Sequence, residues 1–488
     1  MRVKLAGFNI DTDVLRRLDP DGQPYLTPET LSAAYARISR SSLPVDQLRK
    51  KACQDVVKAR RSNQRIIFEM GHHSVAEHAV FNFDIMGVSR LALEEIEKFR
   101  LVSYTEKSQR YVTLEGDQVM PREIGDAECK KLFLATVRRQ NRFYFKAFHA
   151  LHRRLRRRFP QELACAGGRK QVENWAKEDS RYILPLASRG QVGMTINARN
   201  LEHLLRRFRL SPRREVREIG AKLYALVLPI APSIILFPEP SPFERQAFPI
   251  PDESPESLPR PRMAPAGSEL KIVSSTPAAD DLLLASGLAA RHGLGLPAAA
   301  LAVKRLPQAR KRSLFRDFFR SMQFFDAPPR EFEMAGIAFQ AIVSASNFAQ
   351  LKRHRMATLL AANYDPELGC TVPESIREAG LDGEFMEIIE ATDRAFRRLG
   401  ERVGAAADYL LTNSHRRRVL MKMNLRELYH FVRLRADENA QWDIRGLALR
   451  LAAEAKKRMP LAAMMLCGKS AFAEEFARIY GEPPRANP

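Results

Sequence analysis

Residues 95–111 (EIEKFRLVSYTEKSQRY) bring together side chains that can bind a phosphorylated, polar ring. Arginine and lysine side chains bind phosphate oxygens, while serine hydroxyls and a carboxylate bind the polar edge of such a ring. Residues 350–355 (QLKRHR) repeat only the cationic part of this cluster. The two segments therefore predict one anion-binding site that is divided between two parts of the chain. The side chains concerned are Lys98, Arg100, Ser103, Glu106, Ser108, Arg110, Tyr111, Arg353, His354 and Arg355.

The elements that position these side chains follow the same order in both parts of the chain. Apolar and polar residues alternate over residues 80–86 and again over 337–343, which predicts two half-buried strands. Apolar residues then recur at helical spacing from Ser89 onward, and a second helix is predicted through residues 348–355. His354 and the arginines on both sides of it are therefore expected on the last turn of a helix.

The rest of the pattern indicates an internal duplication. Between the two halves, residues 237–267 hold nine of the thirty prolines and show little apolar periodicity, which predicts an extended linker. The predicted domains are therefore residues 1–236 and residues 268–488. The matching segments are the short strands 3–5 and 270–273, the long helices 129–159 and 384–411, the helices 196–209 and 424–435, and the helices 215–227 and 440–457.

The composition indicates a chain that folds without membrane insertion or disulfide bonds. Hydrophobic residues make up 45% of it, yet no apolar run is long enough to span a membrane. Residues 1–16 also lack the pattern of a signal peptide. The five cysteines lie far apart without a CxxC pair, so neither a zinc site nor a disulfide framework is expected. We therefore expect a soluble, cytoplasmic protein without a metal centre.

The formal net charge of +22 indicates affinity for anions such as nucleotides, phosphates or nucleic acid. The densest basic runs are residues 153–159 and the group Arg206, Arg207 and Arg209. Both lie in predicted helices and lack the interleaved aromatic residues of a base-stacking surface. Nucleic acid is therefore not favoured as a partner, and much of the excess charge is expected on a solvated surface.

Several ordered motifs resemble those of the flavin-dependent thymidylate synthases. Residues 71–78 (GHHSVAEH) are followed by FNFDI and by Ser89-Arg90, as in that family. The family signature R-H-R-x-x-S-x-N-E-x-S-x-R-Y corresponds to residues 98–111, which read K-F-R-L-V-S-Y-T-E-K-S-Q-R-Y. The resemblance covers nearly the whole chain outside the linker. Further matching segments are RYILP at 181–185, NARNLEH at 197–203, QLKRHR at 350–355, NLRELYHFVRLR at 424–435 and AQWDIR at 440–445.

The resemblance implies an α+β fold that contains two tandem copies of a thymidylate synthase-like domain. Each copy is expected to have a mixed or antiparallel sheet flanked by long helices, and the two copies are expected to form a pseudo-dimer. The family is typically a homotetramer, so a chain with two fused copies is expected to form a homodimer, which is a pseudo-tetramer.

Each half departs from the family signature in a different place. The first half keeps the residues of the nucleotide arm but loses the histidine on the flavin side, where Phe99 stands. The second half keeps QLKRHR but loses the nucleotide arm. Because these losses are complementary, the resemblance implies one retained composite site between the halves and a decayed mirror site. The replacements are Glu95, Lys98, Phe99 and Thr105 in the first half, and Ala361, Asn363, Asp365 and Asp408 in the second, with Asp408 at the position that corresponds to Arg181.

The resemblance also implies ligand roles for the residues that match. The implied dUMP-binding residues are Glu106, Ser108, Arg110, Arg181, Gln350 and Arg435. Three of them, Ser108, Arg110 and Arg435, are also the implied catalytic residues. The implied FAD-binding residues are His72, Ser74, Glu77, Arg353, His354, Arg355, Asn424, Arg426 and His430.

The implied reaction is the reductive methylation of dUMP to dTMP, with methylenetetrahydrofolate as carbon donor and NADPH as reductant through FAD. The residue types suit these ligands, because guanidinium groups bind a phosphate dianion in a bidentate manner and hydroxyl or amide groups bind a uracil edge. Two alternatives remain open. One is a catalytically degenerate relative that binds flavin or a nucleotide, and the other is a basic nucleic-acid-binding protein on the same scaffold.

The candidate residues also have purely structural interpretations. Arg100 and Arg355 are compatible with capping of helix C-termini, where the helix dipole favours cations. His354 is compatible with a packing role, and the segment that contains His72 and Ser74 is compatible with a local hydrogen-bonded turn. The full motif context favours ligand roles for Arg110 and His354.

Overall fold

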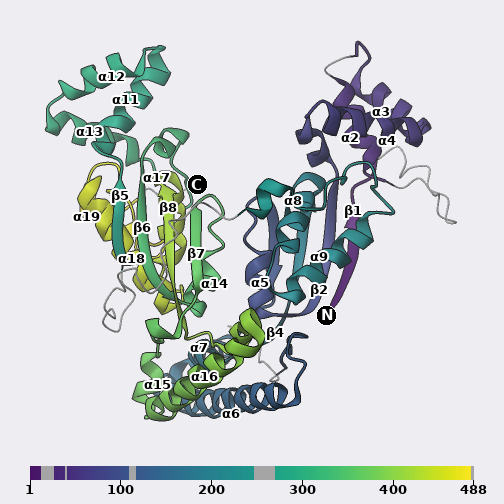
Figure 1. The fold of residues 1–488 in the computed structure, drawn as a ribbon. Helices are drawn as coiled ribbons and strands as arrows, with labels where there is room; N and C mark the ends of the chain where they lie inside the picture. Colours follow the sequence, from purple (N-terminus) through teal and green to yellow (C-terminus); the bar gives the residue numbers. More distant parts are fainter. Residues whose placement is uncertain (12–26, 39–40, 109–116, 247–269, 485–488) are drawn as a thin grey trace. The chain divides into compact units, whose positions relative to one another are not determined.

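The computed structural model describes residues 1–11, 27–38, 41–108, 117–246 and 270–484, and it divides into two compact units (Figure 1). Unit 1 comprises Met1–Arg260 and Glu374–Thr412, and unit 2 comprises Pro261–Pro373 and Asn413–Pro488. Each unit contains a four-stranded antiparallel sheet.

The sheet of unit 1 has the strand order β1-β2-β4-β3. Along β2, Phe81, Phe83 and Ile85 are buried while Asn82 and Asp84 are exposed, which confirms the predicted alternation. One face of the sheet therefore contributes to the core of the unit. The strands are β1 (Arg2–Phe8), β2 (Val80–Ser89), β3 (Val102–Glu106) and β4 (Arg189–Asn197).

Helices of unit 1 pack their apolar sides into the same core. On α8, Leu201, Leu204, Leu205 and Phe208 recur at helical spacing and lie in one cluster with the buried residues of β2. The helices of this core are α5 (Arg90–Ile96), α8 (Ala198–Arg209) and α9 (Arg214–Val227), with a 3₁₀ helix at His73–His78. A separate apolar cluster joins α2 (Glu29–Arg37), α3 (Val45–Gln54) and α4 (Val56–Asn63), and the short helix α10 (Pro242–Arg245) follows α9 along the chain.

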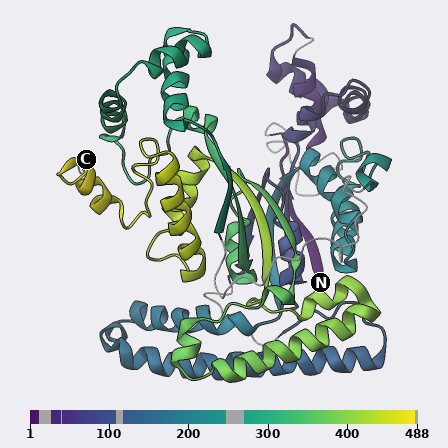
Figure 2. The same ribbon diagram turned by 60° about the vertical axis from the view of Figure 1, so that its left-hand side comes forward.

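A layer of long helices completes unit 1 and combines helices from both halves of the sequence (Figure 2). Phe143 of α6 and Phe385 of α16 meet edge to face, with their ring centroids 5.7 Å apart. Gln140 of α6 donates hydrogen bonds to Thr392 Oγ1 and to the backbone oxygen of Leu410, both at 2.9 Å. The long helix of the second half therefore belongs to the unit that contains the first sheet. The helices of the layer are α6 (Ala127–Arg158), α7 (Ala166–Ser180), α15 (Glu374–Glu378) and α16 (Asp382–Val403).

Unit 2 repeats the sheet topology with the strand order β5-β6-β8-β7. Buried residues of β6 form one core with α17 and α18. The strands are β5 (Leu270–Ser275), β6 (Gly336–Ser344), β7 (Thr358–Tyr364) and β8 (Arg416–Asn424). The helices are α11 (Ala279–His292), α12 (Leu296–Lys304), α13 (Gln308–Phe319), α14 (Ala345–Leu351), α17 (Leu425–Arg435), α18 (Trp442–Arg458) and α19 (Phe472–Tyr480), with a 3₁₀ helix at Arg330–Met334.

The repeated topology confirms the predicted α+β fold with two tandem copies. Two predicted helix ends are wrong. The helix that begins the QLKRHR segment ends at Leu351, because the chain then turns and the His354 amide donates to the Leu351 oxygen at 3.2 Å. The helix predicted to reach residue 411 ends at Val403 and continues as the 3₁₀ helix Gly404–Leu410. Strands β3, β4, β7 and β8 are absent from the sequence-based prediction.

Most of the predicted linker, residues 237–267, lies outside the described residues, and the domain boundaries at 236 and 268 stay a prediction. Within the described ranges, no helix combines the length and apolar character needed to cross a membrane.

Candidate functional site

A buried polar cluster in unit 2 joins the turn after α14 to helix α17. His354 lies in this turn and is only 4% exposed. Its Nδ1 lies 3.2 Å from Glu427 Oε1, and its Nε2 accepts a hydrogen bond from Arg435 Nε at 3.0 Å. A neutral imidazole has one donor and one acceptor, so the Nδ1–H tautomer satisfies both contacts.

The environment of His354 keeps its imidazole neutral. Burial and the adjacent Arg435 guanidinium lower the pKa of His354 to about 3. The ring therefore carries a single proton near pH 7, and its second nitrogen remains an acceptor. Protonation would replace the hydrogen bond from Arg435 with a clash between two donors.

Gln350 completes the cluster from the last turn of α14. Arg435 Nη1 donates to Gln350 Oε1, and Nη2 donates to the Gln350 backbone oxygen, both at 3.4 Å. Gln350 is 8% exposed, and its Nε2 has no hydrogen-bond partner among the described residues. A buried donor without a partner is unfavourable, so this amide is suited to bind an oxygen of a ligand. The structure thus brings together two of the implied dUMP-binding residues.

A pocket of about 290 Å³ in unit 2 adjoins this cluster. The His354 ring lies 5.7 Å from the ring of His430, which is part of the pocket wall, and Glu427 belongs to both. Cationic and aromatic side chains share the wall, so the pocket suits a ligand with anionic groups and a flat ring. The residues of this wall include Phe324, Asn424, Arg426, Glu427, His430, Arg433, Lys469 and Phe472.

Local structure fixes the position of Asn424 and Arg426 at this pocket. The Asn424 side chain caps α17 and accepts a hydrogen bond from the Glu427 amide at 2.8 Å. Arg426 is held by Glu333 Oε1 at 3.0 Å and by the Pro328 backbone oxygen at 2.8 Å. Three implied FAD-binding residues, Asn424, Arg426 and His430, therefore line one pocket.

Arg353 and Arg355 do not share the inward direction of His354. The chain turns through this segment, with the Arg355 amide donating to the Arg353 oxygen at 3.1 Å. Arg353 is exposed and Arg355 is half-buried, whereas His354 between them is buried. The two arginines therefore lie next to the cluster along the chain, and both are more exposed to solvent than His354.

The implied ligand residues of the first half lie in unit 1. Glu106 ends β3 and Ser108 follows two residues later, both half-buried, while Arg110 and Tyr111 lie outside the described residues. Arg181 is 6% exposed in a 3₁₀ turn after α7, where its Nε donates to the Glu178 oxygen at 3.2 Å.

His72 and Ser74 are exposed at the 3₁₀ helix that precedes β2. Glu77 in this helix pairs with Arg199 at 2.5 Å. In unit 2, Glu333 pairs with Arg426 at 3.0 Å from the corresponding 3₁₀ helix before β6. The duplication therefore preserves this ion pair in both halves, although the GHxSxxEH motif itself is recognisable only in the first.

Two positions of the unit 2 cluster, His354 and Arg435, have aromatic counterparts in unit 1. Phe99 lies as far beyond the capping Ser89 as His354 lies beyond the capping Ser344. Likewise, Phe208 and Arg435 lie equally far beyond the asparagines that cap α8 and α17. The Phe99 and Phe208 rings meet with centroids 5.9 Å apart. An aromatic contact thus replaces the hydrogen bond between His354 and Arg435.

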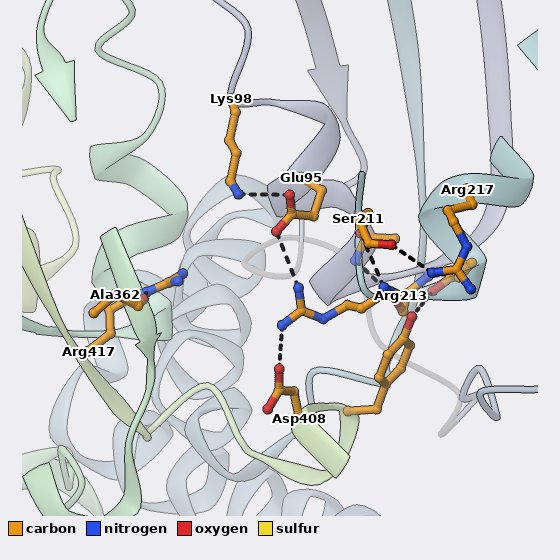
Figure 3. A network of polar contacts seen from close by, with 12 residues as sticks. Glu95, Lys98, Ser211, Arg213, Arg217, Ala362, Asp408 and Arg417 are labelled. Carbon is orange, nitrogen blue, oxygen red and sulfur yellow. Dashed lines mark hydrogen bonds and ion pairs between the residues drawn. The ribbon is translucent and has the colours of Figure 1, made fainter. Parts of the chain in front are cut away.

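A different polar network occupies the corresponding part of unit 1 (Figure 3). The Arg213 guanidinium pairs with Asp408 through Nη2 and with Glu95 through Nη1 at 3.4 Å. Lys98 pairs with Glu95 at 2.7 Å. Burial alone would lower the pKa of Arg213, but the two carboxylates more than offset this and raise it. Asp408, which stands at the position of an implied phosphate-binding arginine, is thus engaged by an internal cation.

In unit 2, β7 is fixed at the positions where the nucleotide arm is lost. The Arg417 guanidinium lies between the rings of Phe348 and Tyr364, at 4.4 and 4.2 Å from their centroids. Its Nε also donates to the Ala362 oxygen at 2.6 Å (Figure 3). The corresponding residue of β4 is Gly190, where an added Cβ would approach Leu93 Cδ1 to 2.6 Å. The two halves therefore differ here in packing as well as in ligand residues.

Sequence reasoning missed Glu427, Glu333 and Arg213. Glu427 stands three residues after a helix cap, where a glutamate usually indicates a capping box. Glu333 lies as far before β6 as Glu77 lies before β2, and a comparison of these two positions identifies it. Arg213 stands at the N-cap position of α9, as Gln441 does in α18, so only an alignment of the two halves reveals it.

Comparisons with known proteins match both halves. The family model described as thymidylate synthase complementing protein matches residues 24–233 and 273–461. A flavin-dependent thymidylate synthase from Geobacter sulfurreducens is 30% identical over 214 residues, which cover 42% of this chain and 80% of that protein. UPF0159 protein Ta1429 from Thermoplasma acidophilum is 25% identical over 452 residues, covering 81% of this chain and 86% of that protein. This second relative therefore extends over both halves.

Among solved structures, one similar chain is a UMP/dUMP methylase, PolB, from Streptomyces cacaoi, bound with 5-Br dUMP. It is 16% identical, with a TM-score of 0.33, over 46% of this chain and 98% of that chain.

Proposed function

This chain belongs to the thymidylate synthase complementing protein family as a tandem-duplicated member, and from that premise we propose that it is an FAD-dependent thymidylate synthase. The proposed reaction is the methylation of dUMP to dTMP with methylenetetrahydrofolate and NADPH. The observation that carries this proposal is the buried cluster of Gln350, His354 and Arg435 beside the unit 2 pocket. Burying polar side chains of this kind is unfavourable unless they are hydrogen-bonded, whereas their donors suit a ligand with carbonyl and phosphate oxygens.

We propose that the unit 2 pocket holds part of a flavin dinucleotide. Its volume is near the lower limit of ligand pockets, about 300 Å³, so the rest of such a ligand would extend beyond it. Arg426, Arg433 and Lys469 would bind phosphate oxygens, while Phe324 and Phe472 would contact a flat ring. Asn424 and His430 would orient the ligand by hydrogen bonds. When bound, the flavin supplies the hydride chemistry, and the chain supplies binding and orientation.

The nucleotide side of the proposed site uses the arginines and hydroxyls implied by the family. Arg110, Arg181 and Arg435 would bind the phosphate, and Ser108 and the free Gln350 amide would bind the uracil edge. Glu106 would accept the uracil N–H or orient a neighbouring side chain. Ser108, Arg110 and Arg435 are proposed as the residues closest to the reacting ring.

Each half supplies one set of residues, and we propose that the two sets serve a single reaction. The first half keeps the nucleotide arm but has Phe99 and Phe208 in place of the polar pair. The second half keeps the polar pair but has lost the nucleotide arm. Asp408 also stands where a second site would need an arginine to bind phosphate, and this carboxylate pairs with Arg213 instead. We therefore expect one dUMP per chain, in a homodimer by analogy with the tetrameric family.

Release of the C5 hydrogen of dUMP tests this function directly. With tritium at C5, we expect release that requires FAD, methylenetetrahydrofolate and NADPH together. A protein that binds FAD or dUMP but releases no tritium under these conditions would instead be the degenerate binding relative.

A pair of histidine variants supplies the matched control for the FAD site. His430→Ala changes a residue of the unit 2 pocket, whereas His203→Ala changes its counterpart on α8, which lies against Phe99. We expect weaker FAD binding only for His430→Ala. Equal losses in both variants would contradict the assignment of the pocket.

A further inference from the structure

We propose that Glu427 is a positioning residue, which holds the His354 imidazole as its Nδ1–H tautomer and thereby orients the Arg435 guanidinium toward the nucleotide. This inference rests on the proposed function and assigns a role to a residue outside the implied ligand sets.

The contacts form a continuous relay. Glu427 Oε1 accepts from His354 Nδ1 at 3.2 Å, and His354 Nε2 accepts from Arg435 Nε at 3.0 Å. The guanidinium is planar, so a fixed Nε determines where both Nη groups lie. Both Nη groups are then directed at Gln350, at 3.4 Å each. The relay therefore sets the geometry of the two side chains proposed to bind dUMP.

Glu427 is required to keep the proton of His354 on Nδ1. A neutral imidazole without an acceptor at Nδ1 can carry its proton on Nε2 instead. That proton would face the Arg435 Nε–H group, donor against donor, and the arginine would have to turn away. Because His354 is 4% exposed, water cannot readily replace the carboxylate.

Glu427 does not take the structural role that its position usually indicates. It is the third residue after the Asn424 cap, where a glutamate commonly returns to the cap amide to form a capping box. Here its carboxylate instead lies against His354, and Asn424 alone supplies the cap. The side chain is 8% exposed, and burying a carboxylate is costly unless it is paired.

The first half of the chain shows whether the relay is needed for folding, because it has the same fold with other residues at these positions. Asn200 occupies the position of Glu427, and its side chain bonds locally to Asn197 Oδ1 at 2.8 Å. Phe99 and Phe208 replace the other two members of the relay. The three positions thus differ together, and the same strand and helices pack without the relay. We conclude that the relay is not needed to build this part of the fold.

The test compares Glu427→Ala, Glu427→Gln and the counterpart variant Asn200→Ala in the full FAD-loaded chain. Calorimetry measures the Kd for dUMP, and nitrogen-15 NMR of labelled histidines measures the His354 tautomer, with His354→Phe used to assign the signal. We expect Glu427→Ala to weaken dUMP binding about 10-fold, the effect of one lost hydrogen bond to a charged group, and to convert His354 to the Nε2–H form. Glu427→Gln keeps an acceptor oxygen, so it should restore the Nδ1–H form and most of the affinity, and Asn200→Ala should match the wild type.

An unchanged dUMP affinity in Glu427→Ala overturns the positioning role, whatever the tautomer. A Glu427→Gln variant as impaired as Glu427→Ala also overturns it, because retention of the acceptor should suffice. A wild-type chain that neither binds dUMP nor releases the C5 hydrogen overturns the proposed function, and the positioning role with it.

Discussion

The three relay residues of unit 2 can be replaced one after another by the residues at the corresponding positions of unit 1. We expect the first replacement to destabilise unit 2 and the next two to restore part of the lost stability. His354→Phe alone removes the donor to Glu427 and the acceptor for Arg435 Nε. Glu427 is 8% exposed, so its carboxylate would stay buried after losing this hydrogen bond. Leaving such groups unsatisfied costs about 1–3 kcal/mol each. We therefore expect His354→Phe to destabilise unit 2 by about 2 kcal/mol or more.

The further substitutions should recover this loss. Adding Arg435→Phe recreates the aromatic contact that Phe99 and Phe208 make with ring centroids 5.9 Å apart, a contact type that contributes about 0.5–1.5 kcal/mol. Adding Glu427→Asn then removes the buried carboxylate and recreates the residue at position 200. The coupling between the first two substitutions should reach about 1 kcal/mol in the stabilising direction.

Calorimetric melting of the full chain measures these steps. For a unit of this size, 1 kcal/mol corresponds to about 2–4 °C in Tm. The single variant should therefore melt about 4–8 °C below the wild type, and the triple variant should melt above the single variant. All three variants should lose dUMP binding. Strictly additive losses would refute the reasoning, because they would mean that the three residues do not act as one hydrogen-bonded unit.

Three further outcomes follow from contacts elsewhere in the two units. Asp126 caps α6, and hydrogen bonding lowers the pKa of its carboxyl to about 2. The ionised carboxylate therefore stabilises the fold above the ordinary aspartate pKa, and this contribution is lost as the pH falls through about 2. Asp126→Ala should lower the Tm at pH 7 and have no effect near pH 1.5. Asp408→Ala leaves the Arg213 cation buried and should cost about 3–5 kcal/mol by calorimetry, without changing the number of dUMP molecules bound. Arg417→Lys should loosen the attachment of β7 to β8, because it removes the planar guanidinium that stacks on Tyr364 and the hydrogen bond to the Ala362 oxygen, and we expect faster hydrogen exchange in 358–364 than in the wild type; unchanged exchange would contradict this attachment.

The sequence predicts best those elements whose periodicity is regular. Strand β2 alternates cleanly between buried and exposed residues, and the sequence locates it correctly. Strand β4 contains Gly190 and Gly193, which weaken the alternation, and it escapes prediction although it pairs along the whole length of β2. The strand is stabilised by its neighbours in the sheet, and that information is not local in the sequence.

The end of α14 shows why the sequence predicts the motif but not the geometry of the site. Lys352 and Arg353 are good helix formers, so propensity alone extends the helix through them. In the structure, the chain turns after Leu351, and this turn directs His354 inward while Arg353 stays exposed. Residue types identified the ligand candidates, but only tertiary packing determined which of them face one another.

Long-range pairs were beyond local reasoning altogether. Arg213 and Asp408 lie in different halves of the sequence and come together within unit 1. The sequence marked Asp408 as a departure from the family pattern, but nothing near it in the chain indicates its partner. The same holds for Glu427, whose local context suggests a cap rather than a contact with His354.

The rate of tritium release from C5-labelled dUMP tests most directly whether both halves serve one reaction. The comparison uses the wild type, Arg181→Ala from the first half and Arg435→Ala from the second, each loaded with FAD and shown by calorimetry to be folded at the assay temperature. We predict release by the wild type and a loss of at least about 100-fold in each variant alone, since each removes a charge-assisted contact to the phosphate. Near wild-type release by either variant would contradict the proposal, because one half would then suffice without the other.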